Sequence, residues 1–210
     1  MFYPVFLDLQ GRSVLVVGGG VIAGRKVESL VAAGATVILV APVVTSSLMD
    51  IANSKTIQLR LRKFMESDLD NMVLVVSATD DPTAQEQIAA AARSRNVPVN
   101  TVDQPKLCDF IVPAIVRKGD IVVAISTSGR SPALAAALRA RIETVITDDA
   151  ARAARVLGEI RNEVHSRFPD PDRRKRVFEA IVASGILDWI KECDDAAALE
   201  RVRGIIEKLA

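Results

Sequence analysis

The sequence of 210 residues has little of what metal, disulfide or nucleic-acid sites require: one histidine, two cysteines, one tryptophan and one tyrosine. Cys108 and Cys193 lie far apart and do not follow a metal-ligand spacing, which fits a reducing compartment without a disulfide framework. His165 has no second histidine and no cysteine in range, so we expect a structural role for it and no metal centre. The few aromatic rings and the net charge of +1 offer no surface for stacking bases or attracting phosphates, so no nucleic-acid partner is expected.

Long uncharged hydrophobic segments are also missing, although half of the residues are hydrophobic. No stretch approaches the roughly 20 apolar residues that a membrane-spanning helix needs, so we expect no membrane partner. The start of the chain carries no basic group and reaches Asp8 before the core of an export signal could develop. The composition therefore predicts a cytoplasmic globular protein with a large core, built as one domain or as one domain with a smaller appendage.

A glycine-rich turn follows the first strongly hydrophobic run of the chain. Residues 14–17 predict a buried strand, and a helical period of apolar residues begins just after the glycines. Gly18, Gly20 and Ala23 fit the G-x-G-x-x-G/A spacing, in which the first glycine turns sharply, the second leaves room for a pyrophosphate, and the third small residue lets the helix pack closely. The start of that helix would present free N–H groups to the phosphates. The alternative is a glycine turn that serves packing alone.

Strands and helices alternate through the first half of the chain. Besides residues 14–17, the sequence predicts buried strands at 36–40, 73–77 and 97–99, an alternating edge strand at 57–62, and helices at about 20–34 and 82–95. This pattern is typical of an α/β fold with a Rossmann-like, doubly wound parallel sheet. Residues 2–9 are expected to form an edge strand or an arm laid over the sheet.

Ligands of such sheets bind beyond the carboxyl ends of the strands, where residues 18–23, 41–45, 79–81 and 100–103 would gather. In many dinucleotide folds an acid at the end of the second strand binds the ribose hydroxyls, but no acid follows Val40 here. No basic pair follows Val40 either, so the sequence does not decide between NAD and NADP.

The pattern changes after Asp103. Apolar runs at 110–116 and 121–126, joined by a polar turn at 117–120, predict a hairpin, and Ser131 before Pro132 predicts the capped start of a helix. Few charges precede Arg139 in this hairpin and helix, which suits a subunit interface. Helical patterns follow at 150–168, 172–184 and 186–209, with a break at 169–171. We therefore predict a dinucleotide-binding domain at 1–112, a dimerisation region at 113–147 and an all-helical C-terminal domain at 148–210.

Five stretches together resemble the dehydrogenase part of siroheme synthases, the precorrin-2 dehydrogenase and sirohydrochlorin ferrochelatase family. They are residues 16–26, 78–81, 100–106, 109–113 and 124–135, in the family's order and spacing. The glycine turn is shared by many folds, whereas the last three stretches together are specific. The resemblance extends over the whole chain, and the family also usually lacks the acid after the second strand.

The resemblance implies that a homodimer oxidises precorrin-2, a tetrapyrrole, to sirohydrochlorin with NAD, and that some members also insert ferrous iron. It implies Asp103 as the essential carboxylate. The expected cofactor-binding residues lie at the strand ends: Gly18, Gly20, Val21, Ile22, Ala23, Pro42, Val43, Thr79 and Asp80. Because the substrate bears many carboxylates, the expected substrate-binding residues are basic or belong to a second helix start: Lys106, Thr127, Ser128, Gly129 and Arg130.

Each of these assignments has a plainer alternative. Asp103 could only shape a turn before a proline, residues 127–131 could form a helix cap and its loop, and the basic residues could be solvated surface charges. For the whole chain, the alternative is a regulatory module that senses NAD or NADH without catalysis and has no need for Asp103. A dehydrogenase of another small substrate is disfavoured, since the sequence shows neither a His–Asp nor a Tyr–Lys catalytic pattern.

Overall fold

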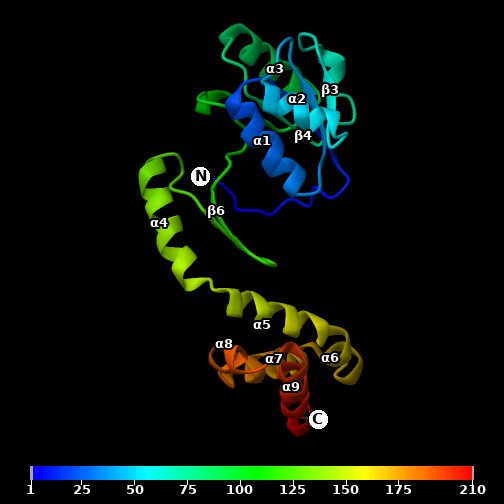
Figure 1. Ribbon diagram of the computed structural model, residues 1–210, viewed down its shortest axis with the longest axis vertical. Coiled ribbons are helices and arrows are strands. Elements are labelled where there is room, and N and C mark those ends of the chain that lie inside the picture. The colour runs from blue at the N-terminus through cyan, green and yellow to red at the C-terminus, as the bar shows by residue number, and fades with distance from the viewer. Residues whose placement is uncertain (1, 210) are drawn as a thin grey trace. The chain divides into compact units, whose positions relative to one another are not determined.

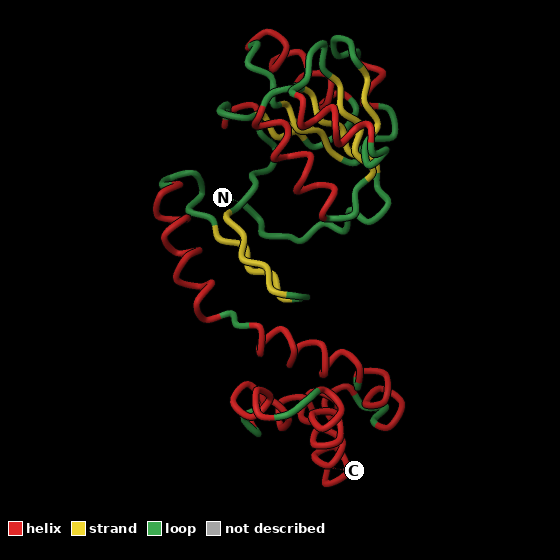
Figure 2. Tube along the Cα trace, viewed as in Figure 1, coloured by secondary structure: helices red, strands yellow, loops and turns green. Residues whose placement is uncertain are grey.

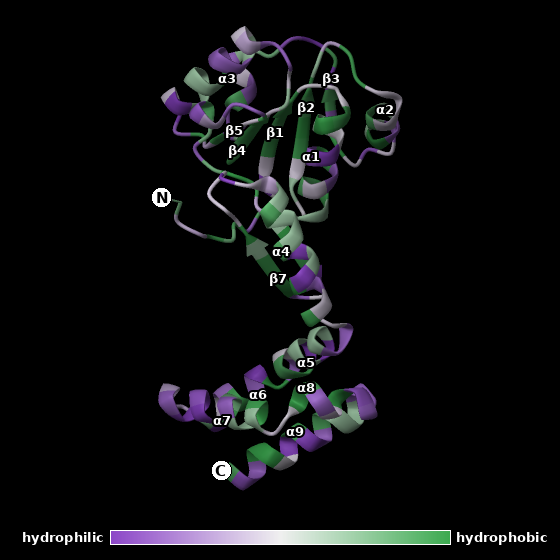
Figure 3. Cartoon of the chain, turned by 90° about the vertical axis from the view of Figure 1, so that its left-hand side faces the viewer, coloured by the Kyte–Doolittle hydropathy of each residue, from purple (hydrophilic) through white to green (hydrophobic). Residues whose placement is uncertain are grey.

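A computed structural model describes residues 2–209 and divides the chain into two compact units, with the boundary between Val112 and Pro113. The first unit, coloured from blue to green in Figure 1, is built on a parallel sheet of five strands. Their order is β3-β2-β1-β4-β5, as the labels in Figure 3 show. The strands are β1 (Ser13–Val17), β2 (Thr36–Val40), β3 (Gln58–Arg60), β4 (Leu74–Ser77) and β5 (Val99–Thr101). The predicted Rossmann-like sheet is therefore confirmed, and the short β3 lies at an edge, as its alternating sequence indicates.

Alternate side chains of the strands enter two hydrophobic cores, one on each face of the sheet. On one face they pack against α1 (Val21–Ala32) and α2 (Ser46–Asn53), and on the other against α3 (Pro82–Ser94). Because helices cover both faces, the central strands are continuous apolar runs and not alternating ones. Figure 3 shows this as strands that are hydrophobic along most of their length.

The segment before β1 forms no strand. Tyr3 and Phe6 are exposed, whereas Leu9 packs against the core under α1. The outer neighbours in the sheet are β3 and β5, so the edge-strand alternative for residues 2–9 is wrong.

The connection between β3 and β4 contains a short 3-10 helix (Glu66–Leu69) in place of a full crossover helix. The buried carboxylate of Asp68 in this helix holds the connection together. The carboxylate of Asp68 accepts hydrogen bonds from Arg60 at 2.6 Å and from Arg62 at 2.6 and 2.7 Å. It also accepts the N–H of Met65 at 2.9 Å. Burial alone would raise the pKa of Asp68, but these hydrogen bonds outweigh burial and lower the pKa to about 2. Both arginines therefore serve the fold.

The second unit begins with an antiparallel hairpin of β6 (Ala114–Lys118) and β7 (Ile121–Ile125), against which α4 (Pro132–Val145) packs. Lys118 pairs directly with Ile121, so the turn consists of Gly119, at φ +53°, and Asp120. The predicted turn at 117–120 is too long, because Arg117 and Lys118 belong to β6. The predicted start of α4 is confirmed.

Only helices follow the hairpin and α4 in the described part of the chain (Figure 2): α5 (Asp148–Glu159), α6 (Arg161–Arg167), α7 (Pro171–Ala183), α8 (Ile186–Trp189) and α9 (Asp195–Leu209). They share a core that includes Phe168, Ile181 and Trp189. The helix predicted over 150–168 is divided at Ile160, just after Gly158 weakens it. None of the helices within residues 2–209 is long and apolar enough to cross a membrane.

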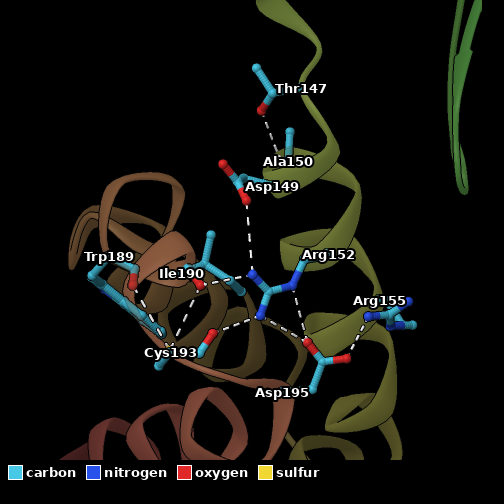
Figure 4. Close-up of polar contacts among 9 residues, drawn as sticks. All are labelled: Thr147, Asp149, Ala150, Arg152, Arg155, Trp189, Ile190, Cys193 and Asp195. Carbon is cyan, nitrogen blue, oxygen red and sulfur yellow. Dashed lines mark hydrogen bonds and ion pairs between the residues drawn. The ribbon is translucent and has the colours of Figure 1, made fainter.

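An arginine of α5 ties these helices together (Figure 4). The Arg152 guanidinium donates hydrogen bonds to Ile190 O at 3.1 Å, to Cys193 O at 2.8 Å, and to the Asp195 carboxylate at 3.1 and 3.2 Å. Arg155 also donates to Asp195, and the hydrogen bond from Arg152 contributes most to lowering the pKa of that carboxyl. The two carbonyls belong to the first residue and to the C-cap of a 3-10 helix (Ile190–Glu192), which is too short to satisfy its own carbonyls. Arg152 therefore has a structural role, because it joins α5 to the 3-10 helix and to the start of α9.

Candidate functional site

The turn between β1 and α1 is enclosed by the loops that follow β2 and β4. Gly18 has φ +128°, and a Cβ atom there would lie 2.3 Å from Ala78 O. A Cβ atom on Gly19 would lie 1.9 Å from Val43 O. Both positions therefore require glycine for packing, Gly18 for its backbone conformation as well.

Gly20 differs from these two glycines because it faces open space. Its φ of −85° is ordinary, and a Cβ atom there would meet nothing within 4 Å. No side chain caps the start of α1, whereas Thr45, Asp81 and Ser131 accept N–H groups at the starts of α2, α3 and α4. The uncapped N–H groups and the positive end of α1 are suited to bind an anion in the space beside Gly20.

The residues that follow Gly20 show which side of α1 remains accessible. Val21 and Ile22 are exposed at 65% and 43%, although both are large and apolar. Ala23 is buried against the sheet. The predicted cofactor contacts Val21 and Ile22 thus lie on the open side of the turn, and Ala23 provides the close packing that the motif requires.

Two more loops reach the same edge of the sheet. Pro42 and Val43 follow β2 and are exposed, Val43 at 77%. After β4, Thr79 O accepts a hydrogen bond from the buried Gln85 at 2.7 Å, and the Asp80 side chain is exposed. The carboxyl ends of parallel strands meet at one edge, so all the predicted cofactor contacts come together around the open side of the glycine turn.

Asp103 follows β5 at this edge. It is exposed and has φ +59°, in the left-handed region that side-chain-bearing residues seldom adopt. The neighbouring backbone is tied down, since Val102 N donates to Ser77 O at 2.9 Å and Gln104 N donates to Thr101 O at 3.3 Å. No side chain within residues 2–209 hydrogen-bonds to the Asp103 carboxylate or pairs with it, which leaves it available to a ligand.

Lys26 and Lys106 are two of the positively charged residues of the first unit. Lys106 lies in the 3-10 helix (Pro105–Leu107) just after Asp103 and is exposed. Lys26 of α1 is half-buried, and burial lowers its pKa, while the neighbouring Cys108 acts in the opposite direction. Sequence reasoning missed Lys26, which stands inside the helical pattern where a lysine is normally solvated. The one feature of the sequence that could have indicated a special role for Lys26 is that no acidic residue lies one helical turn before or after it.

The remaining predicted substrate contacts lie in the second unit, in the loop before α4. Thr127 Oγ1 donates to Ser131 O and accepts from Ser131 N, both at 3.1 Å, so this hydroxyl is used within the loop. Ser128 and Gly129 have φ +54° and +79°, and Arg130 is exposed. The helix-cap alternative thus describes Thr127 and Ser131, whereas Ser128, Gly129 and Arg130 remain open to a ligand.

Within residues 2–209 no group of three or more His, Cys, Asp or Glu side chains could hold a metal ion. His165 is exposed on α6.

Three family models match successive parts of the chain. The model described as putative NAD(P)-binding matches residues 5–114, the sirohaem biosynthesis protein central model matches 118–144, and the sirohaem synthase dimerisation region model matches 150–204. The first model covers more than half of the chain. The dimerisation model falls on α5 to α9, whereas the sequence predicts a dimerisation region at 113–147.

Individual proteins give a consistent result. The chain is 40% identical to a siroheme synthase of Nitrosospira multiformis over 201 residues, which are 94% of this chain and 43% of that protein. It is 40% identical to a siroheme synthase of Pseudomonas fluorescens over 187 residues, 89% of this chain and 40% of that protein. The chain therefore spans less than half the length of these relatives. The solved structure of SirC, precorrin-2 dehydrogenase, matches with a TM-score of 0.75 and 26% identity over 99% of this chain and 98% of that one.

Proposed function

The chain belongs to the putative NAD(P)-binding family and is similar to siroheme synthases and to a precorrin-2 dehydrogenase, and from this premise we propose that it oxidises precorrin-2 to sirohydrochlorin with NAD. The observation that carries the proposal is the combination at one sheet edge of an uncapped helix start beside the open Gly20 and an unpaired carboxylate at Asp103. A dinucleotide pyrophosphate fits the first feature, and an acid–base step fits the second.

The cofactor-binding roles follow from the glycine turn. The N–H groups at the start of α1, at Val21 and Ile22, would donate to the pyrophosphate. Pro42 and Val43 would contact the adenosine end, while Thr79 and Asp80 would line the opposite side. When bound, NAD supplies the acceptor for the hydride.

Asp103 would take the proton that the reaction releases. The oxidation removes two hydrogens from the reduced macrocycle: one C–H bond breaks and its electron pair leaves with the hydrogen as hydride, and a second hydrogen leaves as a proton. An unpaired, exposed carboxylate on a restrained loop is suited to accept that proton within hydrogen-bond reach. The products are sirohydrochlorin, NADH and a proton, which balances the step.

The substrate carboxylates require positive charge and free N–H groups. Lys106 and the half-buried Lys26 would provide the charge in the first unit. Ser128, Gly129 and Arg130 stay predicted substrate-binding residues of the second unit. We also propose a homodimer that acts in the cytoplasm, on the basis of the matched dimerisation region and of the two free cysteines.

Iron insertion into sirohydrochlorin is a second candidate activity. The exposed Asp103 could take the pyrrole protons that ferrous iron displaces, and the macrocycle would itself coordinate the metal. Adding ferrous or cobaltous ion to sirohydrochlorin with and without the protein tests this activity separately from the oxidation.

The proposed oxidation is tested by incubating the protein anaerobically with precorrin-2 and NAD while sirohydrochlorin absorbance and NADH are followed. We expect both to form together, in equal amounts, and only when NAD is present. A protein that binds NAD but forms neither product would be the sensing module instead, and the proposed function would be wrong.

A further inference from the structure

β5 is an edge strand, so the outward-facing backbone groups of Val99 and Thr101 have no neighbouring strand to bond with. Two residues of the returning chain take the place of that strand. Asp109 hydrogen-bonds to the backbone of Val99: its Oδ2 accepts the Val99 N–H at 3.2 Å, and its own N–H donates to Val99 O at 2.8 Å. The Cys108 side chain hydrogen-bonds to the backbone of Thr101: Sγ accepts the Thr101 N–H at 3.2 Å and can donate to Thr101 O at 3.1 Å.

The Cys108 thiol also contacts the far side of the loop that carries Asp103. Sγ lies 3.4 Å from the carbonyl oxygen of Gln104, the residue directly after Asp103. One sulfur atom therefore joins the strand end before Asp103 to the residue that follows it. A thiol suits this position, since it is both a weak acceptor for an N–H and a weak donor to a carbonyl.

Asp103 requires such a restraint because its φ of +59° lies in a sparsely populated region for a residue with a side chain. If the loop were free, more populated backbone conformations would compete and would move the carboxylate. The loop is also held by the backbone hydrogen bonds of Val102 N and Gln104 N and by a long hydrogen bond of 3.4 Å from the Gln85 side chain to Val102 O. The carbonyl of Gln104 is left to Cys108 and to Leu107 N.

We propose that Cys108 is a positioning residue of the dehydrogenase: its thiol fixes the loop of residues 101–104 so that the Asp103 carboxylate keeps one place relative to cofactor and substrate. This inference rests on the proposed function, in which Asp103 accepts a proton. Cys108 itself touches no reacting atom. A misplacement of a reacting group by about 1 Å can lower a rate by about 100-fold, so even a small relaxation of this loop is measurable.

The chain offers a matched control for a merely structural role. Asp109 caps the same edge of β5, two residues earlier along the strand, and makes no contact with Asp103 or Gln104 among the described residues. Asp109→Ala therefore removes the side-chain half of this edge cap, together with the ion pair of Asp109 and Arg93, without freeing the Asp103 loop. Cys193→Ala controls for loss of a thiol, since Cys193 lies in the second unit with sulfur contacts of 3.8 Å to Trp189 O and Ile190 O.

The experiment compares Cys108→Ala, Cys108→Ser, Asp109→Ala and Cys193→Ala in thermal unfolding, NAD affinity and precorrin-2 turnover. We expect Cys108→Ala and Asp109→Ala to lower the thermal midpoint alike. Only Cys108→Ala should lower kcat, by about tenfold, with the Kd of NAD and the KM of precorrin-2 changed less than about twofold. Cys108→Ser should restore kcat to within about threefold of the wild type, because a hydroxyl also donates and accepts.

Several results would overturn the inference. They are an unchanged kcat in Cys108→Ala, an equal loss of kcat in Asp109→Ala, and no recovery in Cys108→Ser. If Cys108→Ala does not fold, alkylating Cys108 in the folded Cys193→Ala protein decides: stoichiometric labelling that leaves kcat unchanged rejects the inference. The proposed function fails in a different way, when the wild-type protein forms neither sirohydrochlorin nor NADH, and the role of Asp103 fails when Asp103→Asn keeps wild-type turnover.

Discussion

Replacing Gly20 by alanine should separate cofactor binding from folding. The φ of −85° suits any residue, and the added Cβ atom would meet no protein atom within 4 Å. Alanine is a poorer N-cap than glycine, but it also reduces the freedom of the unfolded chain. These effects are each about 0.5–1 kcal/mol and opposite in sign, so we expect the free energy of unfolding to change by less than about 1 kcal/mol.

The same methyl group should weaken NAD binding. It would project into the space in front of the α1 start, where the proposed pyrophosphate accepts the N–H groups of Val21 and Ile22. Loss of charge-assisted hydrogen bonds there would cost about 1.5–3 kcal/mol of binding free energy. That corresponds to a Kd for NAD that is weaker by about 10- to 150-fold.

Gly18→Ala is the matched control, because it should damage folding. At φ +128° a side chain is strained, and its Cβ atom would lie 2.3 Å from Ala78 O. We expect a loss of about 3 kcal/mol or more in the free energy of unfolding, which lowers the thermal midpoint by about 6–12 °C. Calorimetry measures both unfolding and NAD titration. If Gly20→Ala bound NAD with wild-type affinity, the pyrophosphate would not lie beside Gly20, and if it unfolded like Gly18→Ala, Gly20 would serve the fold.

Three further predictions concern charged residues. Because hydrogen bonding lowers the pKa of Asp68 from 3.8 to about 2, its contribution of about 2 kcal/mol is complete above pH 3.8 and is lost as pH falls toward 2. Asp68→Asn should then be less stable in urea at neutral pH and lose less on acidification; identical pH profiles would contradict this. Arg152→Met should reduce the free energy of unfolding of the second unit by about 2 kcal/mol and lower its thermal midpoint by several degrees, with NAD affinity unchanged. Arg139→Met is the control, because it breaks only an exposed ion pair with Glu143 and should have little effect. Lys26→Met should raise the KM for precorrin-2 about tenfold without weakening NAD binding, and an unchanged KM would exclude Lys26 from the substrate site.

The strands and helix starts could be predicted because local patterns determine them. A parallel strand covered on both faces must be apolar throughout, so residues 14–17 and 36–40 stand out from the sequence. Asp81 before Pro82 and Ser131 before Pro132 cap helices through contacts only three residues away at most. The glycine spacing likewise indicates, from the sequence alone, that Gly20 is the position that leaves space for a pyrophosphate.

Features that depend on residues distant in sequence could not be predicted. Nothing local distinguishes Gly19, whose need for glycine comes from the carbonyl of Val43. The pairing of Asp68 with two arginines depends on the path of the β3–β4 connection. The role of Cys108 exists only because β5 is an edge strand, which follows from strand order and not from any motif.

Asp103→Asn tests whether Asp103 accepts a proton while hydride leaves to NAD bound at the glycine turn. Asparagine tolerates a φ of +59° and has nearly the same shape, but it cannot take the proton. In a single turnover with precorrin-2 and saturating NAD under anaerobic conditions, we expect sirohydrochlorin to form at least about 100-fold more slowly, with the Kd of NAD unchanged. Formation at the wild-type rate would show that the Asp103 carboxylate is not the proton acceptor.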